Sequence, residues 1–193
     1  MKNFAEAFFD SIWKGLKETQ CDSGGRRLPL GEAVAAFHDE VARCAAAGGK
    51  IFYIGNGGSA SIAGHMAADL WKNGGVKTLC FSEPSLLTCL SNDLGYENVF
   101  SAPTESYADK GDVYVAISSS GQSKNILKAA EAALKKGCVL VTLSGFKSGN
   151  PLRKLGALNF YVESEVYGVV ETAHSAICHA VVDCVIRERS SKK

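Results

Sequence analysis

The sequence predicts an α/β fold: a three-layer sandwich in which helices cover both faces of a five-stranded parallel sheet, with further helices at the N-terminus. Two observations support this prediction. Short apolar runs alternate with longer helical patterns over most of the 193 residues, as in strand–helix–strand units. Two of the apolar runs also end in loops of small residues that lead into a helix, at 55–60 and 118–123. In a parallel sheet both loops lie at the carboxyl edge of the strands, where ligands bind.

The N-terminal segment 1–48 is expected to form two helices that belong to the same domain as the sheet. The first helix covers 4–18, where apolar side chains recur at every fourth position on one face: Phe4, Phe8, Ile12 and Leu16. Residues 21–29 break this helix, because they contain two adjacent glycines and a proline. The second helix covers about 30–47 and ends at two glycines. Since the first helix carries more apolar surface than one packing contact needs, we expect it to form a subunit interface.

The sheet domain is expected to span 49–189, with a polar tail at 190–193. Each expected strand is a short apolar run bounded by residues that favour turns. The five strands are predicted near 50–54, 77–82, 112–117, 138–143 and 158–162. The helices of this domain are predicted near 59–72, 86–92, 123–136 and 169–188.

The composition favours a soluble cytoplasmic protein. The 21 lysines and arginines nearly balance the 20 acidic residues, which argues against a nucleic-acid partner because such proteins carry a basic stripe. The seven cysteines form no CxxC pair and lie mostly in apolar stretches, as free thiols do in a reducing compartment. No signal-peptide run follows the start, and the uncharged stretches are too short or too rich in glycine to span a bilayer, so no membrane partner is expected.

Both loops of small residues are predicted to bind a phosphate group. The first is Gly55-Asn56-Gly57-Gly58-Ser59-Ala60 and the second is Ser118-Ser119-Ser120-Gly121-Gln122-Ser123. A helix N-terminus presents unpaired N–H groups to an anion, glycine lets the backbone approach it, and hydroxyls add donors. The ligand expected from two such loops is a compact phosphorylated molecule.

The first loop also fits a dinucleotide-binding motif. Gly55, Gly57 and Ala60 have its spacing, and Glu83 after the second expected strand could hold a ribose. The serine-rich loop has no role in such a site, so a dinucleotide is the less favoured ligand.

Together with Ser91-Asn92-Asp93-Leu94-Gly95-Tyr96-Glu97 and with Gly111-Asp112-Val113 before the serine loop, these motifs resemble the sugar isomerase (SIS) domain family. Within that family they are most similar to the phosphoheptose isomerases, over about residues 30–188. The resemblance implies a homotetramer with active sites at subunit interfaces. It also implies an aldose–ketose isomerase that converts sedoheptulose 7-phosphate to D-glycero-D-manno-heptose 7-phosphate through an enediol, for the heptose of a surface polysaccharide.

The resemblance also assigns roles to residues. The implied substrate-binding residues are Asn56, Gly57, Gly58, Asn92, Asp93, Ser118, Ser119, Ser120, Ser123 and Glu171. The implied catalytic pair is Asp69, at the reacting carbons, and His179, as its acid/base partner. The implied ligands of one zinc ion per subunit are His65, Asp69, Glu171 and His179. Three positions depart from the family pattern, which has glutamate at 69, glutamine at 171 and arginine at Val169.

The spacing of the ionisable residues leaves more than one interpretation open. His65 and Asp69 are four apart and share a helix face, and Glu171 and His179 lie about 80° apart around one helix. These four side chains could hold a divalent metal or act as an acid/base set without one. They could also be structural, with His65 paired to Asp69 and His179 satisfied in the core.

His174 and Cys178 are a second pair four residues apart on the last expected helix. His174 lies about 140° from His179 around that helix, so the two histidines cannot easily face one ion. We therefore assign Cys178 a structural role.

Three functions stay open. The first is the phosphoheptose isomerase, and the second is an isomerase or epimerase of another phosphorylated ketose, which the departures at Asp69, Val169 and Glu171 favour. The third is a non-catalytic SIS protein that binds a replication initiator or senses a phosphosugar. A pure scaffold has no physical reason to keep four ionisable groups in a cleft, which argues against the third.

Overall fold

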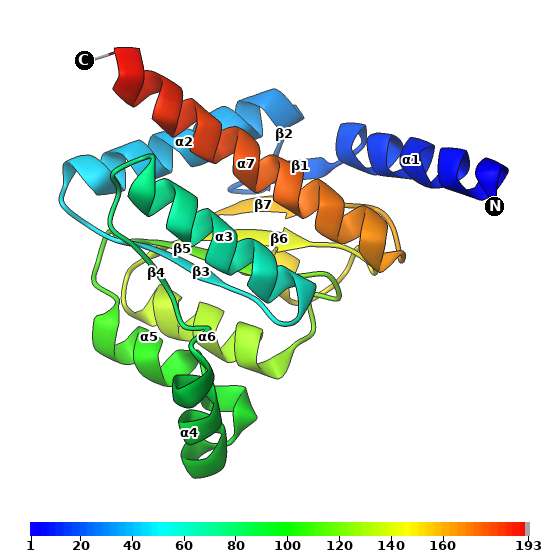
Figure 1. Ribbon diagram of the computed structural model, residues 1–193. Helices are drawn as coiled ribbons and strands as arrows, with labels where there is room; N and C mark the ends of the chain where they lie inside the picture. Colours follow the sequence, from blue (N-terminus) through cyan, green and yellow to red (C-terminus); the bar gives the residue numbers. More distant parts are fainter. Residues whose placement is uncertain (192–193) are drawn as a thin grey trace.

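The computed structural model describes residues 1–191, which form one sheet between two layers of helices (Figure 1). The strands are β1 (Gln20–Ser23), β2 (Arg26–Leu28), β3 (Ile51–Ile54), β4 (Thr78–Cys80), β5 (Val113–Ser118), β6 (Val139–Ser144) and β7 (Leu158–Tyr161). The helices are α1 (Lys2–Lys17), α2 (Leu30–Ala46), α3 (Gly58–Lys72), α4 (Pro84–Leu94), α5 (Ser101–Tyr107), α6 (Lys124–Lys135) and α7 (Tyr167–Ser191). Two short 3₁₀ turns complete the set, η1 (Tyr96–Asn98) and η2 (Leu152–Lys154).

The sheet has the order β2-β1-β7-β6-β5-β3-β4. The five strands from β3 to β7 pair in parallel, which confirms the predicted α/β fold and parallel sheet. All residues of β3, β5 and β7 are buried, as in parallel strands covered by helices on both faces. The helix α5 falls where the sequence predicted only a loop after the Asn92-Asp93 segment.

The sheet has seven strands where five were predicted, because β1 and β2 add an antiparallel hairpin to β7. The segment 21–29 was expected only to break a helix. Gly24 and Gly25 have φ of 56° and 81°, so they form the two-residue turn that joins the hairpin strands. Arg26 and Arg27 are exposed on the outermost strand, where charged side chains protect a sheet edge.

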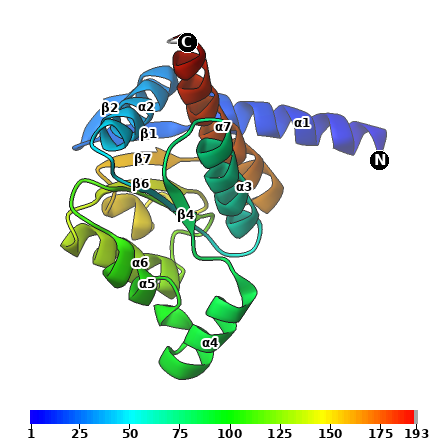
Figure 2. The same cartoon turned by 60° about the vertical axis from the view of Figure 1, so that its left-hand side comes forward.

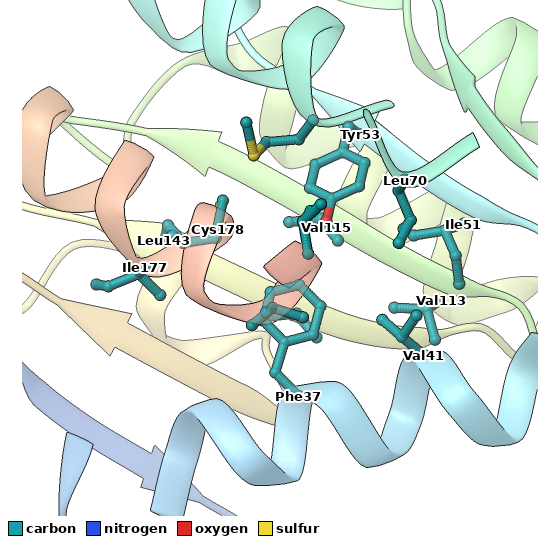
Figure 3. Close-up of a cluster of buried hydrophobic side chains, with 14 of the residues drawn as sticks. Phe37, Val41, Ile51, Tyr53, Leu70, Val113, Val115, Leu143, Ile177 and Cys178 are labelled. Carbon is teal, nitrogen blue, oxygen red and sulfur yellow. The ribbon is translucent and has the colours of Figure 1, made fainter. Parts of the chain in front are cut away.

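Two apolar cores lie on opposite faces of the sheet. The larger core joins the sheet to α2, α3 and α7, and Figure 3 shows Phe37 and Val41 of α2 in the same cluster as Ile177 and Cys178 of α7. The second core joins the other face to α6, whose buried alanines it includes, and to residues that flank α5, and leucines of α4 pack against its edge. In Figure 1 the two helical layers lie above and below the sheet, and both faces of the central strands are therefore closed to water.

The helix α7 is long and apolar enough to cross a membrane by length and composition alone. Half of its most apolar stretch is buried, and the helix contacts α1, α2 and α3. Packing against the sheet accounts for its composition. Ser190 and Ser191 of the predicted polar tail belong to its last turn, and the rest of that tail lies outside the described residues.

Two helices project from the body of the fold. Figures 1 and 2 show α1 extending to one side and α4 extending away from the sheet below α5 and α6. The base of α1 packs through Gly15 against Val169, whereas Phe9 and Trp13 are 67% and 59% exposed. The helix α4 has no buried residue. Both helices therefore present unpaired surface to the solvent.

Candidate active site

A cavity of about 330 Å³ lies between the two loops of small residues. The loops are neighbours because β3 and β5 pair in parallel, with Ile54 opposite Ala116. Eight of the ten predicted substrate-binding residues line this cavity: Asn56, Gly57, Gly58, Ser118, Ser119, Ser120, Ser123 and Glu171. The other lining residues are Ser59, Ile117 and Tyr167. This volume is at the lower end of the range for small-molecule sites.

The first loop depends on its glycines. Gly57 has φ 54° and ψ −124°, a conformation that strains any residue with a side chain. A Cβ on Gly55 would lie 2.5 Å from the backbone of Ser59. As the N-cap residue, Gly57 provides no side chain to the first N–H groups of α3, and within residues 1–191 no other side chain caps them. The loop thus opens a helix N-terminus toward the cavity, where an anion is stabilised.

The serines of the second loop have different tasks. Ser118 Oγ accepts a hydrogen bond from the Gly121 N–H at 3.2 Å and lies 3.4 Å from Ser123 Oγ. Ser120 Oγ accepts from the Gln122 N–H at 3.2 Å. These bonds hold the turn in place. Ser119 Oγ is buried and has no hydrogen-bond partner among the described residues, so it is the serine hydroxyl of this loop that no internal bond engages.

Three of the predicted ionisable residues lie together farther along α3 and α7. His65 Nε2 is 3.2 Å from Asp69 Oδ2, and the rings of His65 and His179 are perpendicular with centroids 5.2 Å apart. The His65 side chain is 61% exposed and that of Asp69 is 28% exposed. The pairing of His65 with Asp69 is therefore present, but His179 is a half-buried surface residue rather than a core histidine.

Glu171 lies apart from this group. Its carboxylate occupies the space that a Cβ on Gly58 would fill, at the wall of the cavity. Gly58 precedes His65 by seven residues, which is two helical turns or about 10 Å. In one chain, therefore, Glu171 lies at the two predicted phosphate-binding loops. The group of His65, Asp69 and His179 lies at a second position, farther along α3 and α7.

A metal ion is implied by the resemblance, and imidazole and carboxylate groups are suitable zinc ligands. Across residues 1–191, however, the structure contains no group of three or more His, Cys, Asp and Glu side chains that could hold a metal ion. The four predicted ligands are not one set within a single chain, because Glu171 is at the cavity.

Two further predicted substrate residues lie outside the cavity. Asn92 and Asp93 are exposed on the projecting helix α4, where Asn92 Nδ2 donates a hydrogen bond to Asp93 Oδ1. The same 91–97 segment reaches the cavity through Tyr96, whose hydroxyl donates to Asn56 Oδ1 at 3.0 Å. The fold of one chain does not bring Asn92 and Asp93 to the phosphate-type loops.

His174 and Cys178 belong to the core. Both are fully buried, and burial raises the pKa of the Cys178 thiol to about 12. This confirms the structural role assigned to Cys178. His174 donates through Nε2 to the Ser144 carbonyl, and burial lowers the pKa of this histidine to about 4, so it is neutral at pH 7.

Two residues of the site were not predicted from the sequence, Tyr167 and Asn125. Tyr167 begins α7 and lines the cavity, and its ring packs edge-to-face on Phe146 with centroids 4.8 Å apart. Phe146 is the one non-glycine residue with positive φ (56°) within the described range, a strained conformation of the kind found near functional sites. Asn125 is 3% exposed and exchanges hydrogen bonds with Asn56. A polar residue in the first turn of a predicted helix was the only signal of its role.

Comparisons with known proteins agree with this arrangement. Residues 30–145 match the family model described as "SIS domain". The chain is 38% identical to the phosphoheptose isomerase of Helicobacter pylori (strain Shi470) over 150 residues, which is 75% of this chain and 78% of that protein. It is 35% identical to the Geobacter sulfurreducens phosphoheptose isomerase over 162 residues, covering 81% of this chain and 85% of the relative.

The structural comparison extends the match to the N-terminal helices. The phosphoheptose isomerase structure from Neisseria gonorrhoeae superposes with a TM-score of 0.80 at 28% identity, covering 95% of this chain and 98% of that one. The structure from Francisella tularensis has a TM-score of 0.82 at 22% identity and covers 97% and 96% of the two chains, which shows the shared fold. With its parallel sheet, its two phosphate-type loops and these relatives, the chain belongs to the phosphoheptose isomerases, a family of SIS-domain sugar-phosphate isomerases.

Proposed function

We propose that this protein converts sedoheptulose 7-phosphate to D-glycero-D-manno-heptose 7-phosphate through an enediol. The observation that carries the proposal is the cavity between the two loops, which combines the N-termini of α3 and α6 with serine hydroxyls. None of its lining residues is a lysine or arginine. A phosphate held there is stabilised by backbone N–H groups, helix dipoles and hydroxyls, so the binding does not need a cationic side chain.

The proposed chemistry takes place at the second position along α3 and α7. An aldose–ketose isomerisation needs a base at the carbon-bound proton and a group that moves protons between the oxygens. Asp69 is the proposed base and His179 its acid/base partner, while His65 fixes Asp69 through their 3.2 Å contact. Because the phosphate loops and these residues are about two helical turns apart, the proposal requires a ligand whose phosphate is remote from its reacting carbons.

We propose that zinc is held by the four implied ligands His65, Asp69, Glu171 and His179, in an arrangement completed by the oligomer proposed below. When bound, zinc would polarise the sugar oxygens during enediol formation. The contacts of His65 with Asp69 and with His179 support this proposal, because they bring three of the four implied ligands together. Metal analysis of protein purified without chelator should give close to one zinc per chain. His65→Ala should lose that zinc, and a metal-free parent protein with full activity would reject the proposal.

We further propose a homo-oligomer, a tetramer as the resemblance implies, with sites completed between subunits. The exposed aromatic residues of α1 and the unburied helix α4 support this, since both are surfaces that a second copy could cover. A neighbouring copy would also explain why Asn92 and Asp93 lie outside the cavity of their own chain. The proposed location is the cytoplasm, and the proposed use of the product is a surface polysaccharide.

A second candidate is an isomerase of another phosphorylated ketose. It is favoured by Val169, which is buried against Gly15 of α1 where the family pattern has an arginine. It is also favoured by the negative charge of Glu171 at the cavity, where the pattern has glutamine.

Comparing ketoses tests both candidates. The parent protein should turn over sedoheptulose 7-phosphate with a higher kcat/KM than fructose 6-phosphate, and sedoheptulose without phosphate should lose most of that efficiency. A higher kcat/KM with fructose 6-phosphate would support the second candidate instead. Equal turnover of the unphosphorylated sugar would contradict the phosphate role of both loops.

A further inference from the structure

Asn56 and Asn125 form a reciprocal pair of hydrogen bonds between the two loops. Asn56 Nδ2 donates to Asn125 Oδ1, and Asn125 Nδ2 donates to Asn56 Oδ1, each at 2.9 Å. The two residues are 69 positions apart, one before α3 and one in the first turn of α6. The pair therefore joins the helix N-termini that form the two sides of the cavity.

The orientation of both amides follows from one backbone group. The Ile126 N–H donates to Asn125 Oδ1 at 3.0 Å. A backbone N–H can only donate, and in the first turn of a helix it has no carbonyl partner within the helix, so the atom facing it must be the Asn125 oxygen. That oxygen must then receive the nitrogen of Asn56, which places the Asn56 oxygen toward the Asn125 NH₂ group.

Tyr96 contacts the same amide oxygen from a third element. Its hydroxyl donates to Asn56 Oδ1 at 3.0 Å, from the 3₁₀ turn that follows α4. The Asn56 oxygen thus accepts two hydrogen bonds, which fills its two lone pairs. The Asn56 nitrogen uses one of its two N–H groups on Asn125, and the other has no acceptor among residues 1–191. Asn56 lines the cavity, so this amide contributes a donor to the site and no acceptor.

We propose that Asn125 is a positioning residue, which locks the Asn56 amide with its free N–H available to an anionic oxygen in the cavity and ties the two loops together. Asn125 is 3% exposed and does not line the cavity, so it acts through Asn56. Without it, the Tyr96 hydroxyl is the one described donor left on the Asn56 oxygen, so the amide can rotate more easily and present its oxygen, which repels a phosphate. The choice of substrate in the test rests on the proposed function, whereas the orientation of the amide does not.

Two variants of Asn125 separate the effect of the Asn56 amide orientation from the effect of the side-chain volume at position 125. Asn125→Asp keeps the shape and still accepts from the Ile126 N–H, but it cannot donate to Asn56 Oδ1. Asn125→Ala removes the pair altogether. Each should raise the KM for sedoheptulose 7-phosphate about tenfold or more while kcat changes little, because the phosphate is bound alike in the ground and transition states. Tyr96→Phe removes one of two donors and should raise KM less than either.

The matched control is Lys128→Ala on the same helix. Lys128 donates to Asn98 and pairs with Glu97 near η1, but it does not contact Asn56. This variant should keep the KM of the parent protein. A KM increase as large as that of Asn125→Ala would show that α6 acts through its attachment to η1, and would overturn the proposal.

Titration with inorganic phosphate, observed at the Asn56 side-chain NH₂ signal by ¹⁵N NMR, gives a readout independent of activity. In the parent protein phosphate should shift this signal. In Asn125→Ala and Asn125→Asp, the phosphate Kd should rise about tenfold and the signal of the free protein should move. If Asn125→Asp leaves the KM, the phosphate Kd and the Asn56 signal unchanged, the proposal is refuted. This outcome counts even if Asn125→Ala fails to fold. A parent protein that binds phosphate but leaves sedoheptulose 7-phosphate unchanged would contradict the proposed function alone.

Discussion

Substituting Ser119 with alanine should stabilise the protein and weaken its substrate binding at the same time. The Ser119 hydroxyl is buried without a partner among the described residues. An unsatisfied buried polar group costs about 1–3 kcal/mol of stability, which the alanine variant recovers. Part of this gain is lost because alanine leaves a small void. We expect a net gain of about 1 kcal/mol, which raises the Tm by roughly 2–4 °C for a chain of this length.

The same substitution removes a donor from the phosphate site. A hydrogen bond to a charged group contributes about 1.5–3 kcal/mol, so KM for the sugar phosphate should rise about 10- to 150-fold with little change in kcat. Thermal melting and steady-state kinetics measure the two effects. Ser118→Ala is the control, because Ser118 Oγ accepts from the Gly121 N–H and its loss should lower the Tm. A lower Tm with unchanged KM in Ser119→Ala would refute the reasoning.

Asp69→Asn and His179→Ala should each lower kcat by about a hundredfold or more with an unchanged circular dichroism spectrum, and turnover at the parent rate by either would remove the proposed acid/base pair. His174 has its pKa lowered by burial to about 4, so its neutral form contributes stability that is complete above pH 6.5 and is lost as the pH falls toward 4. The free energy of unfolding, measured with urea, should therefore be about 2 kcal/mol lower at pH 5 than at pH 7, and His174→Leu should largely abolish this difference. An unchanged difference in that variant would show that other groups cause it. Combining Phe9→Ser with Trp13→Ser should lower the molar mass in light scattering, because both side chains are exposed on α1, whereas the parent mass would exclude α1 as an interface.

The parts of the fold that could be predicted are those with a local signal. The strands β3 and β5 are continuous apolar runs, and the loops that follow them consist of small residues. Parallel pairing then brings the two loops together, because parallel strands end at the same edge of a sheet. The cavity and the predicted lining residues that belong to these two loops could be predicted for this reason, whereas Glu171 of α7 was expected only from the family resemblance.

The hairpin β1–β2 was missed although a signal was present. Two glycines between short runs are typical of a two-residue hairpin turn, but the run after them is Arg26-Arg27-Leu28, which lacks the apolar alternation of a half-buried strand. An edge strand does not need that alternation on its exposed side. The pattern therefore indicated a helix break and gave no sign of a strand.

The arrangement of the ionisable residues depends on their separation along the helix axis, which their angular positions around the helix do not give. Glu171 and His179 lie about 80° apart around α7, which suggested one common site, yet eight residues also separate them by about 12 Å along the axis. The contacts of α3 with α7 then place Glu171 at Gly58 and His179 at His65. Asn125 had only a weak signal, a polar residue in the first turn of a predicted helix, because its partner Asn56 is 69 residues away in the chain.

The most direct test of the central claim is to incubate the protein with sedoheptulose 7-phosphate in D₂O and to follow the sugar by NMR. We predict the signals of an aldoheptose 7-phosphate carrying deuterium at C2, since an enediol takes its new proton from a base that exchanges with solvent. Asp69→Asn, with its fold intact, should leave the ketose unchanged over the same period. A folded parent protein that also leaves the ketose unchanged would contradict the claim that these two loops and the α3–α7 residues form an isomerase site.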